Sequence, residues 1–205
     1  MSGTLYLCAT PIGNLGDITL RVLETLKSVG LILAEDTRVT RKLLNHYEIQ
    51  TPLRSFHAHN EKQREAEVLE RLQNGEDLAL VSDAGLPLIS DPGAGLVRVV
   101  QDAGLQVTCL PGASAPPMAL VLSGMAPIPY CFVGFLPRQQ KARQTLLKNY
   151  QNRAETLVFF ESPHRLVNTL EDIYTQLGDR EATVCRELTK FYEDARRGTF
   201  PALAE

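Results

Sequence analysis

The stretch at 79–93, ALVSDAGLPLISDPG, runs from a short apolar segment into a loop dense in Asp, Gly, Ser and Pro. An apolar run of about four to eight residues that ends in turn formers is typical of a buried strand. Three more such runs occur, so the expected strands are Leu5–Ala9, Gly30–Ala34, Asp77–Val81 and Gln106–Leu110. Helical patterns separate them, at Leu20–Ser28, Glu61–Asn74 and Gly95–Ala103. Strands that alternate with helices predict an α/β fold whose parallel sheet is covered on both faces.

A second, smaller α/β domain is expected after the first. The stretch at 124–138, GMAPIPYCFVGFLPR, is rich in Pro and Gly and indicates a junction, so we place an N-terminal domain at 1–124 and a C-terminal domain at 125–205. The expected elements around and beyond the junction are the helices Ser114–Leu122, Lys141–Asn149 and Arg165–Leu177 and the strands Thr156–Phe160 and Ala182–Arg186. No clear final strand follows, so the C-terminal domain is expected to be truncated.

Composition excludes several classes of protein. The 205 residues are 44% hydrophobic and 22% charged, with a formal net charge of -3, which is the range of globular rather than disordered chains. Gly and Pro interrupt the longest apolar stretch, 119–137, so no membrane span is expected. The first residues lack the basic and apolar regions of a secretory signal, which favours a cytoplasmic protein. The scattered Cys and His residues predict no metal site.

Ligands of open parallel sheets bind beyond the carboxyl ends of the strands, so the loops that follow the expected strands are the candidate sites. In the loop after Val81 we interpret Asp83 as a ligand contact, whereas Asp91 is expected to cap the next helix, with Pro92 at its first position. The small residues PGASA at 111–115 allow a planar ligand to approach the backbone. Neither GNLGD nor GAGLVR matches a P-loop or a Rossmann fingerprint.

Eight motifs follow one another along the chain and together cover essentially residues 4–198: LYLCATPIGNLGDITLR, LILAEDTRVTRKLL, SFHAHNE, ALVSDAGLPLISDPG, LPGASA, GFLPR, FFESPHR and CRELTK. In this order they resemble the tetrapyrrole methylase-like superfamily of S-adenosylmethionine-dependent methyltransferases, specifically its ribosomal RNA small subunit methyltransferase I branch. The resemblance implies a two-domain tetrapyrrole methylase-like fold, a homodimer and S-adenosyl-L-methionine as cofactor. It also implies 2′-O-methylation of the ribose of a cytidine in the decoding region of small-subunit (16S) ribosomal RNA, with the small ribosomal subunit as partner.

Carried over residue by residue, the resemblance implies a set of cofactor-binding positions. They are Asp83, Leu86, Pro87, Ser114, Ala115, Phe160 and Glu187. Leu86 stands where the branch usually has Thr. A cofactor contact made through the backbone would be kept with Leu, whereas a contact made through the Thr hydroxyl would be lost. Family members also continue some tens of residues beyond the CRELTK motif, so we expect this chain to be a fragment with an incomplete cleft.

A ribose hydroxyl is a poor nucleophile and needs a base or strong orientation. The sequence does not rank its candidates, which are Asp36, His57, His59, Glu161, Glu187 and Lys190. Arg38 suits either a phosphate contact or a buried ion pair with Asp36 that organises the loop.

Local features also suggest partners. Between Arg138 and Arg153 there are five basic residues and no acidic one, so Arg138, Lys141 and Arg143 are expected to contact RNA, although such runs are often simply solvated. The segment at 125–136 is too interrupted by Pro for a helix and too apolar for a free surface, which favours a homodimer interface.

Two other functions stay open on the sequence. A small-molecule, tetrapyrrole-type methyltransferase would need a cleft for a large planar acid, and the distribution of Arg and Lys around the opening discriminates it. A non-catalytic adenosylmethionine-binding module would keep Asp83 and Ser114 but transfer no methyl group.

Overall fold

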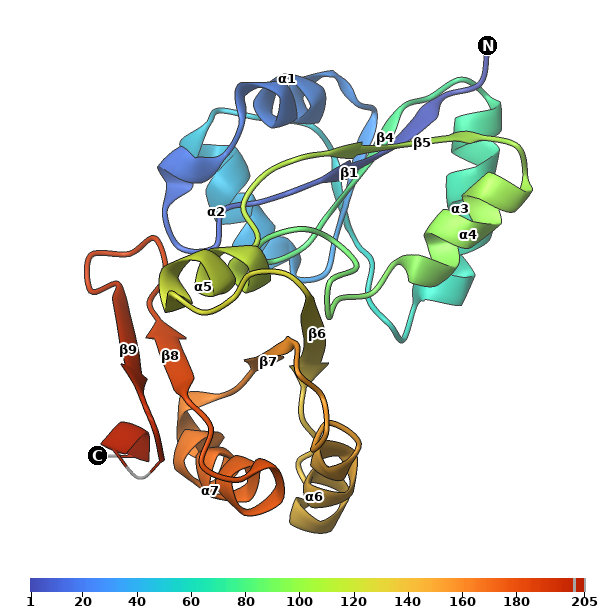
Figure 1. Ribbon diagram of the computed structural model, residues 1–205. Coiled ribbons are helices and arrows are strands. Elements are labelled where there is room, and N and C mark those ends of the chain that lie inside the picture. The colour runs from blue at the N-terminus through green and yellow to red at the C-terminus, as the bar shows by residue number, and fades with distance from the viewer. Residues whose placement is uncertain (201, 205) are drawn as a thin grey trace. The chain divides into compact units, whose positions relative to one another are not determined.

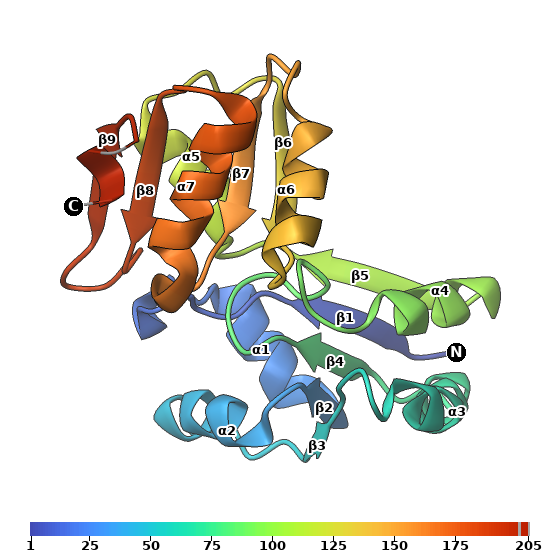
Figure 2. The ribbon, with the colours of Figure 1, turned by 90° about the horizontal axis from the view of Figure 1, so that it is seen from below.

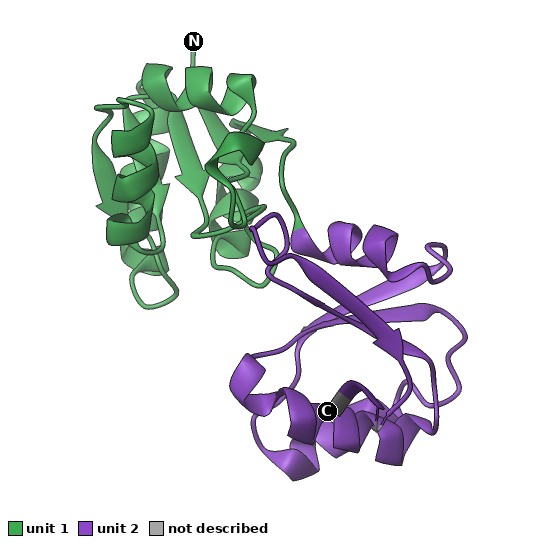
Figure 3. Cartoon of the chain, turned by 90° about the vertical axis from the view of Figure 1, so that its left-hand side faces the viewer, with its two compact units in different colours: residues 1–114 green, residues 115–205 purple. Residues whose placement is uncertain are grey.

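The computed structural model describes residues 1–200 and 202–204, and the chain forms two compact units, unit 1 (Met1–Ser114) and unit 2 (Ala115–Glu205) (Figure 3). The boundary expected at 124/125 shifts to 114/115, because helix α5 (Ala115–Ser123) packs against strands of unit 2. The helix expected at Ser114–Leu122 therefore begins unit 2 rather than ending unit 1.

Unit 1 is a five-stranded parallel sheet with the strand order β3-β2-β4-β1-β5, which confirms the expected fold class. Its strands are β1 (Thr4–Cys8), β2 (Leu31–Ala34), β3 (Leu53–Ser55), β4 (Leu78–Val81) and β5 (Gln106–Leu110). Its helices are η1 (Leu15–Asp17), α1 (Leu20–Ser28), α2 (Thr37–His46), α3 (Glu61–Gln73) and α4 (Ala94–Asp102). The sequence patterns did not predict β3 and α2.

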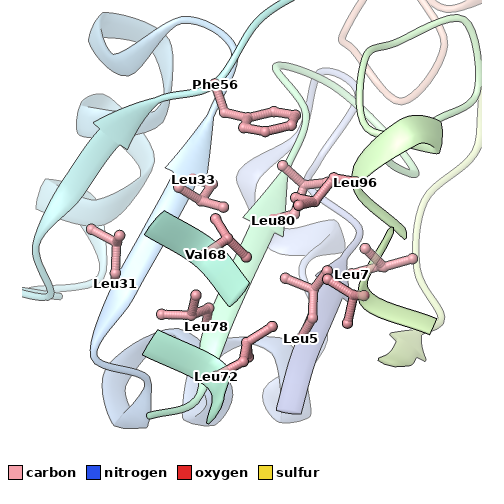
Figure 4. Packing of buried hydrophobic residues seen from close by; sticks show 11 residues of the cluster. Leu5, Leu7, Leu31, Leu33, Phe56, Val68, Leu72, Leu78, Leu80 and Leu96 are labelled. Carbon is pink, nitrogen blue, oxygen red and sulfur yellow. The ribbon is translucent and has the colours of Figure 1, made fainter. Parts of the chain in front are cut away.

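Both faces of this sheet are buried by helices. Successive residues of a strand point to opposite sides, so each strand contributes to the core on either face. Leu31 and Leu33 of β2 pack with α3 and α4, whereas Ile32 and Ala34 pack with α1 and α2. Figure 4 shows the first of these clusters, in which the helices α3 and α4 cover the leucines of β1, β2 and β4. Each fully buried leucine of this kind contributes about 1.5–3 kcal/mol. The sheet is therefore a rigid base for the loops at its strand ends.

Unit 2 contains two short two-stranded sheets with helices on both sides (Figures 1 and 2). Strand β6 (Tyr130–Phe135) pairs in parallel with β7 (Thr156–Phe160), and β8 (Ala182–Arg186) pairs antiparallel with β9 (Asp194–Gly198). The remaining elements are α6 (Gln140–Lys148), η2 (Pro163–Arg165), α7 (Leu166–Leu177) and η3 (Ala202–Ala204). Leu136, Leu147 and Leu177 form the buried core under α6 and α7. Strand β6 occupies the segment where a junction was expected.

A buried ion pair joins α6 to α7. Arg143 Nε donates to Asp172 Oδ2 at 2.6 Å, and only 6% and 3% of the two side chains are exposed. The amides of Gln144 and Gln140 donate to Asp172 Oδ1 at 2.7 and 3.2 Å. Burial opposes ionisation of Asp172, but the hydrogen bonds from Gln144, Gln140 and Arg143 outweigh it and lower the pKa of this carboxyl. Because its guanidinium is enclosed and paired, the prediction that Arg143 contacts RNA is wrong.

Within the described part of the chain, no helix has both the length and the apolar character needed to cross a bilayer. The same residues include no cluster of three or more His, Cys, Asp or Glu side chains placed to hold a metal ion.

Candidate active site

The loop after β4 is fixed to the end of β1. Thr10 and Gly85 exchange both backbone hydrogen bonds, at 2.9 and 3.0 Å. The hydroxyl of Thr10 donates to the carbonyl of Ser82 at 3.0 Å, and the hydroxyl of Ser82 donates to the carbonyl of Gly85 at 2.9 Å. Gly85 has a φ of +85°, and a Cβ there would lie 3.3 Å from Ile12 Cγ2, so a larger residue would disturb the loop. These bonds fix the backbone on both sides of Asp83.

The same loop continues in unusual backbone conformations. Leu88 and Ser90 have φ values of 72° and 68°, which residues other than glycine seldom adopt. Strain of this kind gathers at functional sites. Gly93, with a φ of 122°, is the N-cap of α4, which begins only at Ala94. The prediction that Asp91 caps this helix is therefore wrong, because the turn at Gly93 delays the helix start.

Three carboxylates meet beyond the carboxyl ends of β2 and β4. Burial raises the pKa of Asp91 to about 6, and the negative charges of Glu35 and Asp83 add to the effect, while a hydrogen bond with Ser82 opposes it. Burial also raises the pKa of Glu35, with further contributions from Asp83 and Asp36, and His57 acts in the opposite direction. This edge of the sheet therefore holds a carboxylate that exchanges its proton near neutral pH.

Asp36 has a different environment from these carboxylates. Its side chain caps α2 and accepts from Arg38 through the backbone N–H at 2.8 Å, Nε at 3.0 Å and Nη2 at 2.7 Å. The hydrogen bonds from Arg38 lower the pKa of Asp36 to about 2. The Arg38 side chain is 88% exposed, so the pair is not the buried one considered from the sequence. The backbone N–H of Asp36 donates to Asp83 Oδ1 at 3.0 Å, which links this cap to the loop after β4.

Each unit contains a cavity next to predicted site residues. In unit 1 a cavity of about 190 Å³ is lined by the loop after β1, by α2 and by Ser82 and Asp83. In unit 2 a cavity of about 210 Å³ lies among α5, β7 and β8, and its wall includes Ala115, Phe160 and Glu161. The ring of Phe160 also packs on neighbouring aromatic rings of β6. The walls of the second cavity are mostly apolar.

The predicted cofactor residues divide between the two units. Leu86, half-buried, and Pro87, buried, lie on the same loop as Asp83, and Ser114 ends unit 1. Glu187 does not line the unit 2 cavity, whose wall includes Leu188 instead. Glu187 is 48% exposed and pairs with Lys190 Nζ at 3.0 Å.

Glu161 is held by its neighbours. Its side chain, 8% exposed, accepts from Thr169 Oγ1 at 2.6 Å, from the Ser162 backbone N–H at 2.7 Å and from Arg165 Nη2 at 3.0 Å. Arg165 also donates to the carbonyl of Leu136 at 2.9 Å. These bonds show that Glu161 organises the loop after β7.

Sequence reasoning missed Glu35 and the position of Asp91 beside Glu35 and Asp83. The signal for Glu35 was its position directly after an expected strand, next to Asp36. His57 and His59 lie with ring centroids 6.0 Å apart, and His57 is close enough to Glu35 to affect its pKa. Arg138 and Lys141 are exposed at the start of α6, as a phosphate contact requires.

The family model of Tetrapyrrole (Corrin/Porphyrin) Methylases matches residues 4–204 of this chain. The chain belongs to the tetrapyrrole methylase family. S-adenosylmethionine is the methyl donor of this family, which confirms the cofactor expected from the sequence.

Within the tetrapyrrole methylases, the chain groups with proteins called ribosomal RNA small subunit methyltransferase I, as the motifs indicated. It is 53% identical over 197 residues to the protein of that name from Bacillus subtilis (strain 168), with coverage of 96% of this chain and 68% of the relative. It is 52% identical over 198 residues to the one from Synechocystis sp. (strain ATCC 27184 / PCC 6803 / Kazusa), with coverage of 96% and 71%.

Solved structures agree on the tetrapyrrole methylase fold. A diphthine synthase superposes with a TM-score of 0.76 at 13% identity and covers 98% of this chain and 84% of its own. A cobalt precorrin-4 methyltransferase superposes with a TM-score of 0.69 at 16% identity, with coverage of 96% and 85%. At these identities the likeness concerns the fold alone.

Proposed function

We propose that this chain is an S-adenosylmethionine-dependent methyltransferase of small-subunit ribosomal RNA, which methylates the 2′-hydroxyl of a cytidine ribose in the decoding region. The observation that carries the proposal is the 53% identity, over 96% of this chain, to a relative named ribosomal RNA small subunit methyltransferase I. The choice of nucleotide and of the ribose oxygen is what the family resemblance of the motifs implies. We place the reaction in the cytoplasm, with the small ribosomal subunit as partner.

The residues present suit this cofactor, which carries a planar base, hydroxyl groups and positive charge. In unit 1, carboxylates such as Asp83 accept hydrogen bonds from hydroxyl or ammonium groups. Ala115 and Phe160, which line an apolar cavity of unit 2, stay candidates from the resemblance. When bound, the cofactor supplies an electrophilic methyl group on a sulfonium. The chain's own task is then to orient the acceptor hydroxyl and to exclude water. In our proposal Leu86 and Pro87 contribute through the loop backbone, and Ser114 and Glu187 stay candidates.

We propose Asp91 as the group that accepts the proton of the ribose hydroxyl. A general base works best when its pKa lies near the working pH, and the pKa of Asp91 is about 6. Asp36 and Glu161 fit this role less well, because Arg38 holds Asp36 and three donors hold Glu161. Lys190 and Glu187 are exposed and paired with each other.

We further propose that the chain forms a homodimer through the segment at 125–136. Ile128, Tyr130 and Phe135 of this segment are 83%, 46% and 59% exposed, which is unusual for apolar side chains so close together. Light scattering at micromolar concentration should give twice the mass of one chain, and Ile128→Asp should shift it to the monomer. A monomeric wild-type protein would contradict the proposed dimer.

The function is tested by incubating the full chain and methyl-labelled S-adenosylmethionine with small ribosomal subunits that lack the modification. Digestion of the RNA to nucleosides, followed by mass spectrometry, should place the label on 2′-O-methylcytidine. Label on a base, or no transfer to RNA, would contradict the proposal. Transfer to a tetrapyrrole acid offered in parallel would favour the small-molecule function instead. Cofactor binding without any transfer would favour the non-catalytic module.

A further inference from the structure

The turn between β8 and β9 exposes two adjacent aromatic side chains. Phe191 is 94% exposed and Tyr192 is 75% exposed, compared with 59% for Phe135 and 46% for Tyr130. Their ring centroids are 5.0 Å apart and the ring planes meet at 88°. Edge-to-face contact between the rings leaves faces of both open to solvent.

The backbone of this turn is well defined by hydrogen bonds. The Lys190 N–H donates to the carbonyl of Glu187 at 3.0 Å, and the Glu193 N–H donates to the carbonyl of Lys190 at 3.1 Å. The Glu193 carboxylate also accepts from the Thr189 N–H at 2.7 Å. The two rings are therefore held outward on a fixed support at the end of the hairpin that Figure 2 shows at the edge of unit 2.

Cationic side chains accompany the rings. Arg186 and Arg196 share a single carboxylate, that of Asp194, at 3.2 and 2.9 Å, and Lys190 pairs with Glu187 at 3.0 Å, so each cation of the turn has a carboxylate partner. Both guanidiniums are more than half exposed, and Lys190 is 45% exposed. Ion pairs at such exposed positions contribute little, so these cations can contact a phosphate instead at small cost.

We propose that this surface, the aromatic tip (Lys190, Phe191 and Tyr192, with Arg186 and Arg196 behind it), binds unpaired bases of an RNA by stacking. Aromatic faces beside cations are the combination by which proteins hold single-stranded nucleic acid, because every base has a face to stack and every nucleotide a phosphate. A duplex does not offer its base faces, so the aromatic tip should prefer single-stranded RNA. The inference rests on the proposed methylation of RNA, and it adds the surface of the chain that binds unpaired nucleotides.

The test uses fluorescence anisotropy of a labelled single-stranded RNA 12-mer, and of the same sequence as a duplex, with the full chain. The double variant Phe191→Ala/Tyr192→Ala should bind the single strand about tenfold or more weakly, given the usual contribution of stacking. Its preference for the single strand over the duplex should shrink, while the salt dependence stays because the cations remain. Arg196→Gln should instead reduce the slope of log affinity against log salt concentration, the salt slope, by about 0.7.

Matched variants separate stacking from other effects. Phe191→Leu/Tyr192→Leu keeps the apolar character and should bind as weakly as the alanine variant, whereas Phe191→Tyr/Tyr192→Phe keeps both rings and should bind like wild type. Leu20→Ala, at a residue 79% exposed in unit 1, is the control and should change nothing. Circular dichroism confirms that each variant is folded.

Three outcomes overturn the inference alone. Unchanged RNA affinity in the alanine variant removes the aromatic tip from RNA binding, even if wild type still methylates RNA. Full affinity in the leucine variant shows apolar contact rather than stacking. A loss of RNA affinity that light scattering traces to dissociation of the chains assigns the aromatic tip to self-association. Failure of wild type to bind or methylate any RNA overturns the proposed function together with the inference. This result therefore differs from the three above, in which only the aromatic tip loses its role.

Discussion

At the strand ends of unit 1, Glu35, Asp83 and Asp91 lie near one another with few cationic partners, whereas in unit 2 Asp172 and Glu161 are each surrounded by donors. The pKa of Asp91 rises to about 6, and that of Asp172 falls. The difference follows from the number of donors that compensate burial. It separates a carboxylate that holds the fold, Asp172, from one whose pKa burial raises, Asp91.

The largest expected effect is on the stability of unit 2. Arg143→Ala should lower the free energy of unfolding by about 3–5 kcal/mol, because Asp172 would stay buried without its cation. Urea denaturation followed by circular dichroism measures the loss. The double replacement Arg143→Met/Asp172→Leu should lose much less, and Arg38→Ala, at an exposed pair of unit 1, should change stability little. Equal losses from Arg143→Ala and Arg38→Ala would remove the contrast between the two regions.

The next effect concerns the reaction. Asp91→Asn should slow methyl transfer by about 100-fold or more, because an amide cannot accept the proton. A base must be ionised to act, so the wild-type rate should rise as the pH increases through about 6 and level off above it. The rate profile of the variant should lack this limb, while cofactor affinity is kept. Asp102→Asn, at an exposed carboxylate of α4, is the control. A normal rate in Asp91→Asn would show that Asp91 is not the base.

These two predictions also show what the sequence can and cannot reveal. Helix α1 and strand β7 follow the expected bounds because their apolar patterns are regular. Strand β6 was hidden by Pro and Gly around it, and β9, with the sequence DARRG, pairs through its backbone at an exposed edge where apolar side chains are not required.

The candidate site also contains residues that the sequence predicts and residues that it does not. Asp83 was predictable from its position after a strand. The proximity of Glu35 to Asp91 depends on β2 and β4 being neighbours in the sheet, which the separate patterns of the two segments do not show. The burial of Arg143 was hidden as well, because its partner Asp172 lies on a different helix.

A smaller effect is expected at the basic start of α6. Arg138→Ala/Lys141→Ala, which leaves the buried Arg143 intact, should reduce the salt slope of RNA binding by about 0.7 for each phosphate that the variant no longer neutralises. Cofactor affinity should not change. Lys62→Ala, at an exposed lysine of α3, serves as the control and should keep the wild-type slope. An unchanged slope in the double variant would assign this surface to solvent alone.

The most direct test of the account is a calorimetric titration of S-adenosylmethionine into the full chain, wild type and Asp83→Asn, with Asp102→Asn as the matched control. Wild type and control should bind one cofactor per chain with equal affinity. Asp83→Asn should bind about ten- to a hundredfold more weakly, because it loses a hydrogen bond to a charged group. Absence of binding by wild type, or equal affinity in Asp83→Asn, would contradict the claim that Asp83, at the strand ends of unit 1, holds the methyl donor.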